Sequence, residues 1–102
     1  MSQVDLDVKI DEKISDVITE PGKYKVIMLN DERTPMDFVV NILMLIFKQS
    51  EETAKKIMLT IHTDGSAVVG IYTYEIAEQK SVEATTLSRD SGFPLSVKME
   101  KE

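Results

Sequence analysis

The feature that most constrains the fold of this chain is a polar segment, residues 30–36, that separates a strand pattern from a helix pattern. Residues 24–29 read Tyr-Lys-Val-Ile-Met-Leu, a short apolar run typical of a strand buried on at least one face. Residues 38–47 form the longest apolar stretch, which Asn41 interrupts and which has the length of a buried helix. The sequence therefore predicts a strand that leads through residues 30–36 into a buried helix.

The start of that helix carries residue types that favour helix initiation. Thr34 is predicted to be the N-cap, and Pro35 the first helical residue, where its missing N–H costs nothing. Asp37 has capping-box spacing from Thr34 and favours the positive end of the helix. The helix is predicted to end at Phe47 or Lys48.

The remaining pattern predicts a second helix capped by Ser50 and ending near Asp64 and Gly65, a strand over 67–74, a weaker helix over 75–91 and a strand over 95–99. In the weaker helix the residues expected to face inward are Ile76, Ala77, Ala84 and Leu87. The resulting order, β-α-α-β-α-β, predicts an α+β domain with a three-stranded antiparallel sheet packed against three helices.

The first 22 residues differ in composition from the rest. They are acidic, contain no aromatic residue and end at Pro21-Gly22, a turn or linker signal, so residues 1–22 are expected to be a flexible acidic extension. An alternative is an edge strand, because Val4, Leu6, Val8 and Ile10 alternate with polar residues. Residues 23–102 are predicted to form one domain with a single core.

Composition restricts the class of partner. The formal charge is −6, from 12 Lys and Arg against 18 Asp and Glu, which makes nucleic acid an unfavourable partner and a cationic or amphipathic ligand a better one. No apolar run is long enough to span a membrane, and no signal-like start is present, so the expected location is the cytoplasm. The absence of cysteine fits that location and excludes disulfides and thiolate sites.

Three hydrogen-bond acceptors are candidates for binding a primary ammonium, which has three donors. They are the amide oxygen of Asn30, the carboxylate of Glu32 and one ring nitrogen of a neutral His62, the only histidine. Two alternatives stay open. Asn30 and Asp31 can simply form a turn that ends the strand, and His62 can be a solvated residue at a helix end.

Apolar residues accompany these acceptors. Met58 and His62 are four residues apart and so share a helix face, Ile61 is adjacent, and Met36 lies at the start of the preceding helix. Each methionine on its own is more typical of a core, and only the coincidence with the acceptors favours a pocket. Nucleophilic catalysis lacks its usual residues, and a metal site built from His62, Asp64, Asp31 and Glu32 has no recognised ligand spacing, so neither an enzyme nor a cofactor is expected.

A family resemblance rests on several separated motifs, which read Tyr24-Lys25-Val26, Asn30-Asp31-Glu32, Thr34-Pro35-Met36-Asp37-Phe38-Val39-Val40, Ile57-Met58 with His62, Gly65, Gly70, Tyr74-Glu75-Ile76-Ala77-Glu78 with Lys80, and Pro94-Leu95. From residue 23 to residue 102 the chain resembles the ClpS family. These adaptors deliver substrates with N-end-rule signals (N-degrons) to an AAA+ Clp unfoldase and its peptidase. The resemblance implies the ClpS fold, which the C-terminal domain of a ribosomal stalk protein shares.

The resemblance also assigns roles to individual residues. It implies that Asn30, Glu32 and His62 hold the α-amino group of a substrate's first residue, typically Leu, Phe, Tyr or Trp. It implies an apolar pocket for the first side chain, formed by Met28, Thr34, Met36, Met58, Ile61 and Leu95. It places contacts with the N-terminal domain of a ClpA-like unfoldase at Glu75 and Lys80, and implies that the extension engages the unfoldase during delivery. The adaptor itself is expected to be monomeric in isolation.

Two residues depart from the family pattern. Glu32 stands where aspartate is more usual, and Ile61 stands where valine is more usual. One methylene more or less in an apolar pocket changes the discrimination between apolar side chains by about 1–3 kcal/mol. These two residues therefore leave open which of Leu, Phe, Tyr and Trp is the preferred first residue. Two further hypotheses follow: a specialised paralogue with narrowed specificity, and a structural or assembly module of the stalk-protein fold that binds no free N-terminus.

Overall fold

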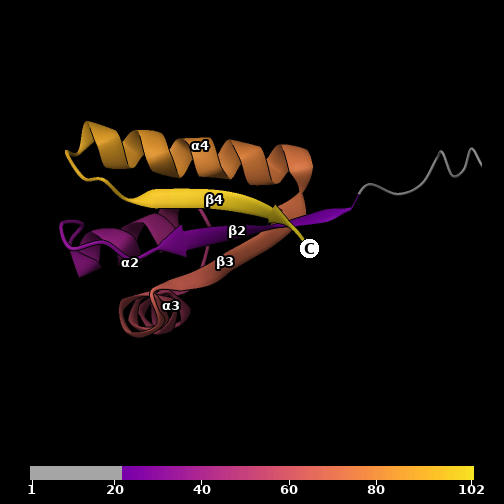
Figure 1. Cartoon of the computed structure of the whole chain (residues 1–102). Helices are drawn as coiled ribbons and strands as arrows, with labels where there is room; N and C mark the ends of the chain where they lie inside the picture. The colour runs from indigo at the N-terminus through magenta and orange to yellow at the C-terminus, as the bar shows by residue number, and fades with distance from the viewer. Residues whose placement is uncertain (1–21) are drawn as a thin grey trace, which may run out of the picture.

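The computed structural model describes residues 22–102, so the predictions for the extension, including the edge strand, lie outside the described residues. In chain order the elements are β2 (Lys23–Leu29), α2 (Met36–Leu45), α3 (Glu51–Asp64), β3 (Ser66–Thr73), α4 (Tyr74–Asp90) and β4 (Ser96–Lys101) (Figure 1). The predicted order of elements and the α+β class are confirmed. Among these residues no helix is both long and apolar enough to cross a membrane.

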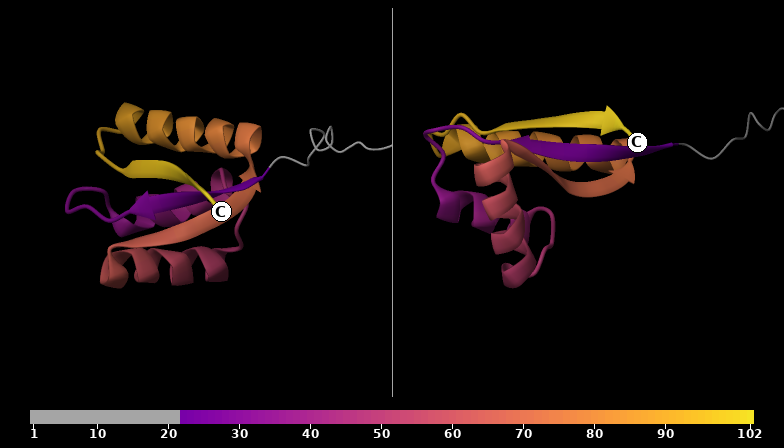
Figure 2. Two further views of the ribbon diagram at one scale, coloured as in Figure 1. Left: turned by 45° about the vertical axis from the view of Figure 1, so that its right-hand side comes forward. Right: turned by 60° about the horizontal axis from the view of Figure 1, so that its bottom comes forward.

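The sheet has β2 at its centre, with β3 and β4 antiparallel to it on either side. In Figures 1 and 2, α4 runs along β4 and α3 lies beside β3. Because strand side chains alternate between faces, Val26 and Met28 point to the same side, and both are fully buried (0% exposed). They belong to one core with residues of all three helices, among them Ile42, Ile61 and Ala84.

The start of α2 differs from the prediction. The helix begins at Met36, and Pro35 occupies the N-cap position in an extended conformation with no side-chain cap. Thr34, the predicted N-cap, therefore lies one position before the observed one, and its hydroxyl donates to Oδ2 of Asp31, at 2.8 Å. The helix ends at Leu45, before the predicted Phe47 or Lys48, and Lys48 adopts a left-handed backbone conformation with φ 59°.

The second helix agrees with the prediction at both ends. Ser50 caps α3 by accepting a hydrogen bond from the backbone N–H of Thr53, at 3.2 Å. Gly65 ends it in the left-handed region, with φ 93°, which favours glycine because a side chain would be strained there. The N–H of Gly65 donates to the carbonyl of Ile61 at 2.9 Å, so the last turn of α3 is closed.

The face of α4 that packs against the sheet contains two of the four residues predicted to face inward. Ala77 and Ala84 are buried as expected, but Ile76 and Leu87 are 43% and 36% exposed, so their predicted inward orientation is wrong. The buried residues of this helix are Ala77, Ser81, Ala84 and Ser88. Their spacing of four, three and four residues forms a single stripe, and such small residues allow close packing of α4 against the sheet.

Candidate functional site

The loop between β2 and α2 is organised by Asp31. Its carboxylate accepts hydrogen bonds from the backbone N–H groups of Arg33 at 2.8 Å and Thr34 at 2.7 Å, and from the Thr34 hydroxyl at 2.8 Å. Partial burial on its own would raise the pKa of Asp31, but these hydrogen bonds and the nearby charge of Arg33 outweigh it and hold the pKa below its ordinary value. The Asp31 carboxylate therefore stabilises the conformation of the loop, and both of its oxygens accept hydrogen bonds from loop residues.

This role for Asp31 gives a prediction about stability and pH. Asp31→Ala should lower the free energy of unfolding at pH 7 by about 1–2 kcal/mol, the cost of losing a capping-type acceptor. Because the folded pKa lies below the ordinary value of 3.8, the stabilisation is present above that pH and is lost as the pH falls through the folded value. Urea unfolding should show that the difference in the free energy of unfolding between wild type and Asp31→Ala is smaller at pH 3 than at pH 7. The exposed Glu83→Ala serves as control, and an equal difference at both pH values would contradict this role.

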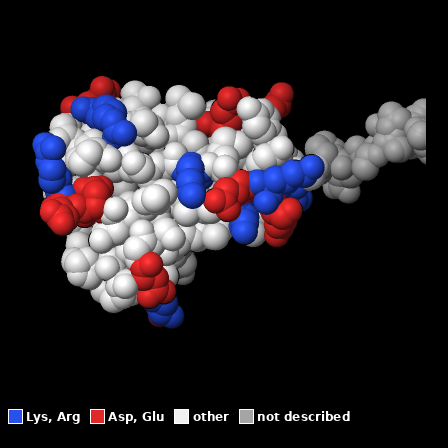
Figure 3. Space-filling view, viewed as in Figure 1, with Lys and Arg blue, Asp and Glu red and all other residues white. Residues whose placement is uncertain are grey.

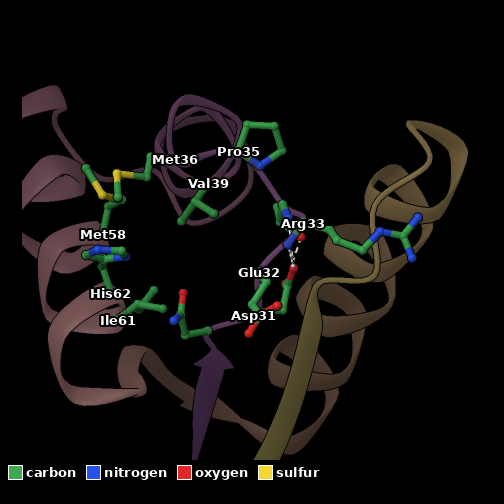
Figure 4. A pocket seen from close by; sticks show the side chains of 11 residues that line it. Asp31, Glu32, Arg33, Pro35, Met36, Val39, Met58, Ile61 and His62 are labelled. Carbon is green, nitrogen blue, oxygen red and sulfur yellow. Dashed lines mark hydrogen bonds between the residues drawn. The ribbon is translucent and has the colours of Figure 1, made fainter.

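A backbone hydrogen bond joins the loop to the end of α3. The N–H of Asn30 donates to the carbonyl of Gly65 at 2.8 Å, and His62 lies in the last turn of α3, three residues before Gly65. Asn30, Glu32 and His62 consequently line the same cavity, which has a volume of about 430 Å³. Figure 4 shows His62 on the α3 side of this cavity and the loop residues on the other.

The apolar part of the cavity comes from two helices. Met36 and Val39 belong to α2, and Met58 and Ile61 belong to α3 (Figure 4). Met36 is 44% exposed, whereas Val39 and Ile61 are almost fully buried, so the cavity is open at Met36 and closed at its inner end. A small adjoining space shares Val39, Ile61 and Thr34 with the cavity and is also lined by Leu95.

Two residues lie differently from the sequence prediction. Met28 has no exposed surface and is not among the residues that line the cavity, since it is an inward residue of the central strand and belongs to the core. Its place in the pocket wall stays a prediction. Val39 lines the cavity, and the wall predicted from the sequence does not include it. The signal was available, because Val39 follows Met36 by three residues and therefore shares its helix face.

The two residues that the resemblance assigns to an unfoldase contact lie on α4, away from the cavity. Glu75 is exposed in the first turn of the helix. Lys80 is partly buried, and its ammonium donates to the carbonyl of Ile46 at 2.7 Å and lies 5.5 Å from the centre of the Tyr72 ring. Lys80 thus stabilises the end of α2 within the molecule.

The geometry of the cavity defines a class of protein. Exposed acceptors that include a carboxylate line the cavity together with an apolar part that is closed at its inner end, which suits a ligand with a cation next to a hydrophobic group. Within residues 22–102 no cluster of three or more His, Asp or Glu residues is arranged to hold a metal ion. The fold and the cavity are those of a small ligand-binding module.

Comparison with known proteins identifies the family. The sequence profile described as "ATP-dependent Clp protease adaptor protein ClpS" matches residues 19–98. The chain is 48% identical over 88 residues to the adapter ClpS of Treponema denticola, covering 86% of this chain and 87% of the relative. It is 42% identical over 102 residues to the adapter ClpS 2 of Agrobacterium fabrum, covering 100% and 99% of the two chains. The chain therefore belongs to the ClpS family of Clp protease adaptors.

A solved structure of a family member agrees with the fold. The structure of Agrobacterium tumefaciens ClpS2 bound to L-phenylalaninamide superposes with a TM-score of 0.79 and is 46% identical in sequence. The match covers 81% of this chain and 100% of the other. The ligand of that relative has a free α-amino group next to an apolar benzyl side chain.

Proposed function

We propose that this chain binds the free N-terminus of proteins that begin with Leu, Phe, Tyr or Trp and delivers them to an AAA+ Clp unfoldase for degradation. One observation carries the proposal: the cavity combines the acceptors Asn30, Glu32 and His62 with an apolar interior. The L-phenylalaninamide bound by the Agrobacterium relative has the same two features, a cationic amine and a large apolar side chain.

Each part of the cavity has a role in this proposal. The ammonium of the first residue donates to the Asn30 amide oxygen, the Glu32 carboxylate and one ring nitrogen of His62, which satisfies its three donors. The first side chain enters between the two helices and is surrounded by Thr34, Met36, Val39, Met58, Ile61 and Leu95. Burying a large apolar side chain there contributes about 1.5–3 kcal/mol.

Delivery is proposed from the family and from the exposed surface of α4. We assign the contact with a ClpA-like N-terminal domain to the side of α4 that carries Glu75 and Lys80. Because the Lys80 ammonium is held by the Ile46 carbonyl, Glu75 is the residue of the two that is free to contact a partner. Residues 1–22 are proposed to act as the extension that the unfoldase engages, and the adaptor is proposed to be a cytoplasmic monomer that needs no cofactor.

A second candidate function, a narrowed specificity, is favoured by Ile61. This residue is only 3% exposed and lines both the cavity and its inner end, so its additional methyl relative to valine reduces the space for the first side chain. Such a change is worth about 1–3 kcal/mol between apolar groups. A panel of peptides that differ only in the first residue distinguishes a broad from a narrowed preference.

Peptide binding tests the proposed function directly. Two labelled peptides that begin with Phe, one with a free and one with an acetylated amino group, are titrated with the full chain by fluorescence anisotropy. Acetylation removes the positive charge and two donors while keeping the side chain, so affinity should fall at least tenfold. Equal affinities would reject the proposal and favour a structural module without an N-terminus site.

A further inference from the structure

A second pocket adjoins the candidate site on the side of Arg33. It has a volume of about 300 Å³ and is lined by Arg33, Arg89, Gly92, Phe93 and Pro94. Arg33 lines both this pocket and the cavity, so the two are neighbours. In Figure 4 the Arg33 side chain points away from Met36 and His62, toward the connection between α4 and β4. We call this space the Arg33–Arg89 pocket.

The side of this pocket formed by Arg89 is held in place by hydrogen bonds. One guanidinium nitrogen of Arg89, Nη1, donates to the carbonyls of Phe93 at 3.1 Å and Leu95 at 2.8 Å. The N–H of Phe93 donates to the carbonyl of Ser88 at 2.9 Å, and the Phe93 ring packs edge-on against Phe38, with centroids 4.8 Å apart. Arg89 is therefore oriented before a ligand binds, and its remaining N–H groups keep donor capacity.

The pocket is positively charged in a chain of net charge −6. Between residues 22 and 102 the ion pairs within 4 Å are Lys55–Glu51, Lys56–Glu52 and Lys98–Glu100, so neither arginine is paired with a described carboxylate. Asp31 lies near enough to Arg33 to feel its charge, but both its oxygens already accept hydrogen bonds within the loop. Figure 3 shows basic side chains next to acidic ones at the end of the molecule where α4 turns into β4, and the residues that line the pocket itself include the two arginines and no carboxylate.

The opposite side of the cavity adjoins a groove that is apolar and negatively charged, unlike the Arg33–Arg89 pocket. A groove of about 470 Å³ continues from Met36 and Met58 between α2 and α3, and Val40 and Leu59 contribute to its apolar lining. Asp37 and Glu51 also line this groove, with Lys55 paired to Glu51 at 3.0 Å, so its net charge is negative. An acidic peptide segment is repelled there and attracted on the side of Arg33.

We propose that the Arg33–Arg89 pocket binds an acidic side chain in the residues that directly follow the first residue of a bound peptide. The inference rests on the proposed function and adds a substrate class to it, namely N-termini with Asp or Glu at the second or third position. A peptide advances 3.3–3.6 Å per extended residue, so the second or third side chain is the one that reaches a pocket sharing a wall residue with the cavity. The planar guanidinium groups offer paired donors to a carboxylate.

A charge-swap experiment tests this pocket. Three peptides that begin with Phe carry Glu, Ala or Lys at positions two and three, and their affinities for the full chain are measured at low salt. Wild type should prefer the Glu peptide over the Lys peptide by up to about fivefold, the upper end of the range of a solvent-accessible ion pair. Arg33→Glu should reverse that order. Lys23→Glu, an exposed residue at the far end of β2, makes the same change in net charge and should keep the wild-type order.

The outcomes separate this inference from the proposed function. The Ala peptide is also tested with an acetylated amino group, and this pair reports on N-terminus binding alone. If acetylation weakens binding but the Glu and Lys peptides bind equally, or if Arg33→Glu does not change their order, the pocket is rejected while the proposed function stands. If Lys23→Glu reverses the order as Arg33→Glu does, the preference comes from overall charge and the pocket is again rejected.

Discussion

Replacing His62 with alanine is expected to weaken binding of a peptide with a free N-terminal Phe by about 10-fold to 150-fold. This range corresponds to the roughly 1.5–3 kcal/mol of a hydrogen bond to a charged group. The imidazole lines the cavity from the last turn of α3 and is exposed, so the change removes an acceptor for the ammonium without opening the core. Anisotropy titrations of wild type and His62→Ala measure the effect.

Two controls make the His62→Ala result specific. Thr60→Ala changes another exposed residue of α3 that does not line the cavity, and its affinity should match that of wild type. The acetylated peptide should lose little further affinity on His62→Ala, because acetylation has already removed the positive charge that strengthens this contact and two of the three donors. Binding that survives His62→Ala unchanged would make His62 an ordinary helix-end residue and remove it from the site.

Replacing Met28 with alanine is expected to lower the free energy of unfolding by about 2–5 kcal/mol, the usual cost of truncating a large buried side chain. Met28 is fully buried at the centre of the sheet, opposite Ala67 on β3 and Val97 on β4. The preference for the first residue should stay as in wild type, because Met28 does not line the cavity. Urea unfolding measures the stability, and a peptide panel measures the preference.

Met36→Ala is the matched control for Met28→Ala, since it makes the same change at a methionine that is 44% exposed beside the cavity. The loss of stability should be small, whereas larger or β-branched first residues should bind better because the mouth of the cavity widens. The two variants should thus separate stability from specificity. A Met28→Ala protein with normal stability and altered preference would support the assignment of Met28 to the pocket wall.

Local patterns were sufficient for the order of the elements and for several of their ends. Ser50 and Gly65 limit α3 as predicted, because capping by a hydroxyl and termination by a left-handed glycine depend on residues close in sequence. The prediction for Thr34 failed for a related reason. The Thr34 hydroxyl and the Asp31 carboxylate are both local acceptors for backbone N–H groups before α2. The backbone N–H and the hydroxyl of Thr34 both donate to the Asp31 carboxylate, which determines the conformation of Thr34.

Burial was harder to predict than element type. Ile76 and Leu87 are apolar but exposed, whereas Ser81 and Ser88 are buried on the same helix. Periodicity identifies a face, but the distance between α4 and the sheet decides which residue sizes fit there, and that distance is a property of the packed domain. The same reason separates Met28 from Met36 and Met58, which have equal hydrophobicity and different surroundings.

The sequence by itself determined the β-α-α-β-α-β order, the acidic character and the residue types suited to an ammonium beside an apolar group. Only the tertiary structure decided which of those residues share a cavity. Asn30 and His62 lie 32 positions apart, and they line one cavity because the Asn30 N–H donates to the Gly65 carbonyl, at 2.8 Å. Hydrogen bonds and packing between distant segments set that proximity, and neither is encoded in the local periodicity of a single element.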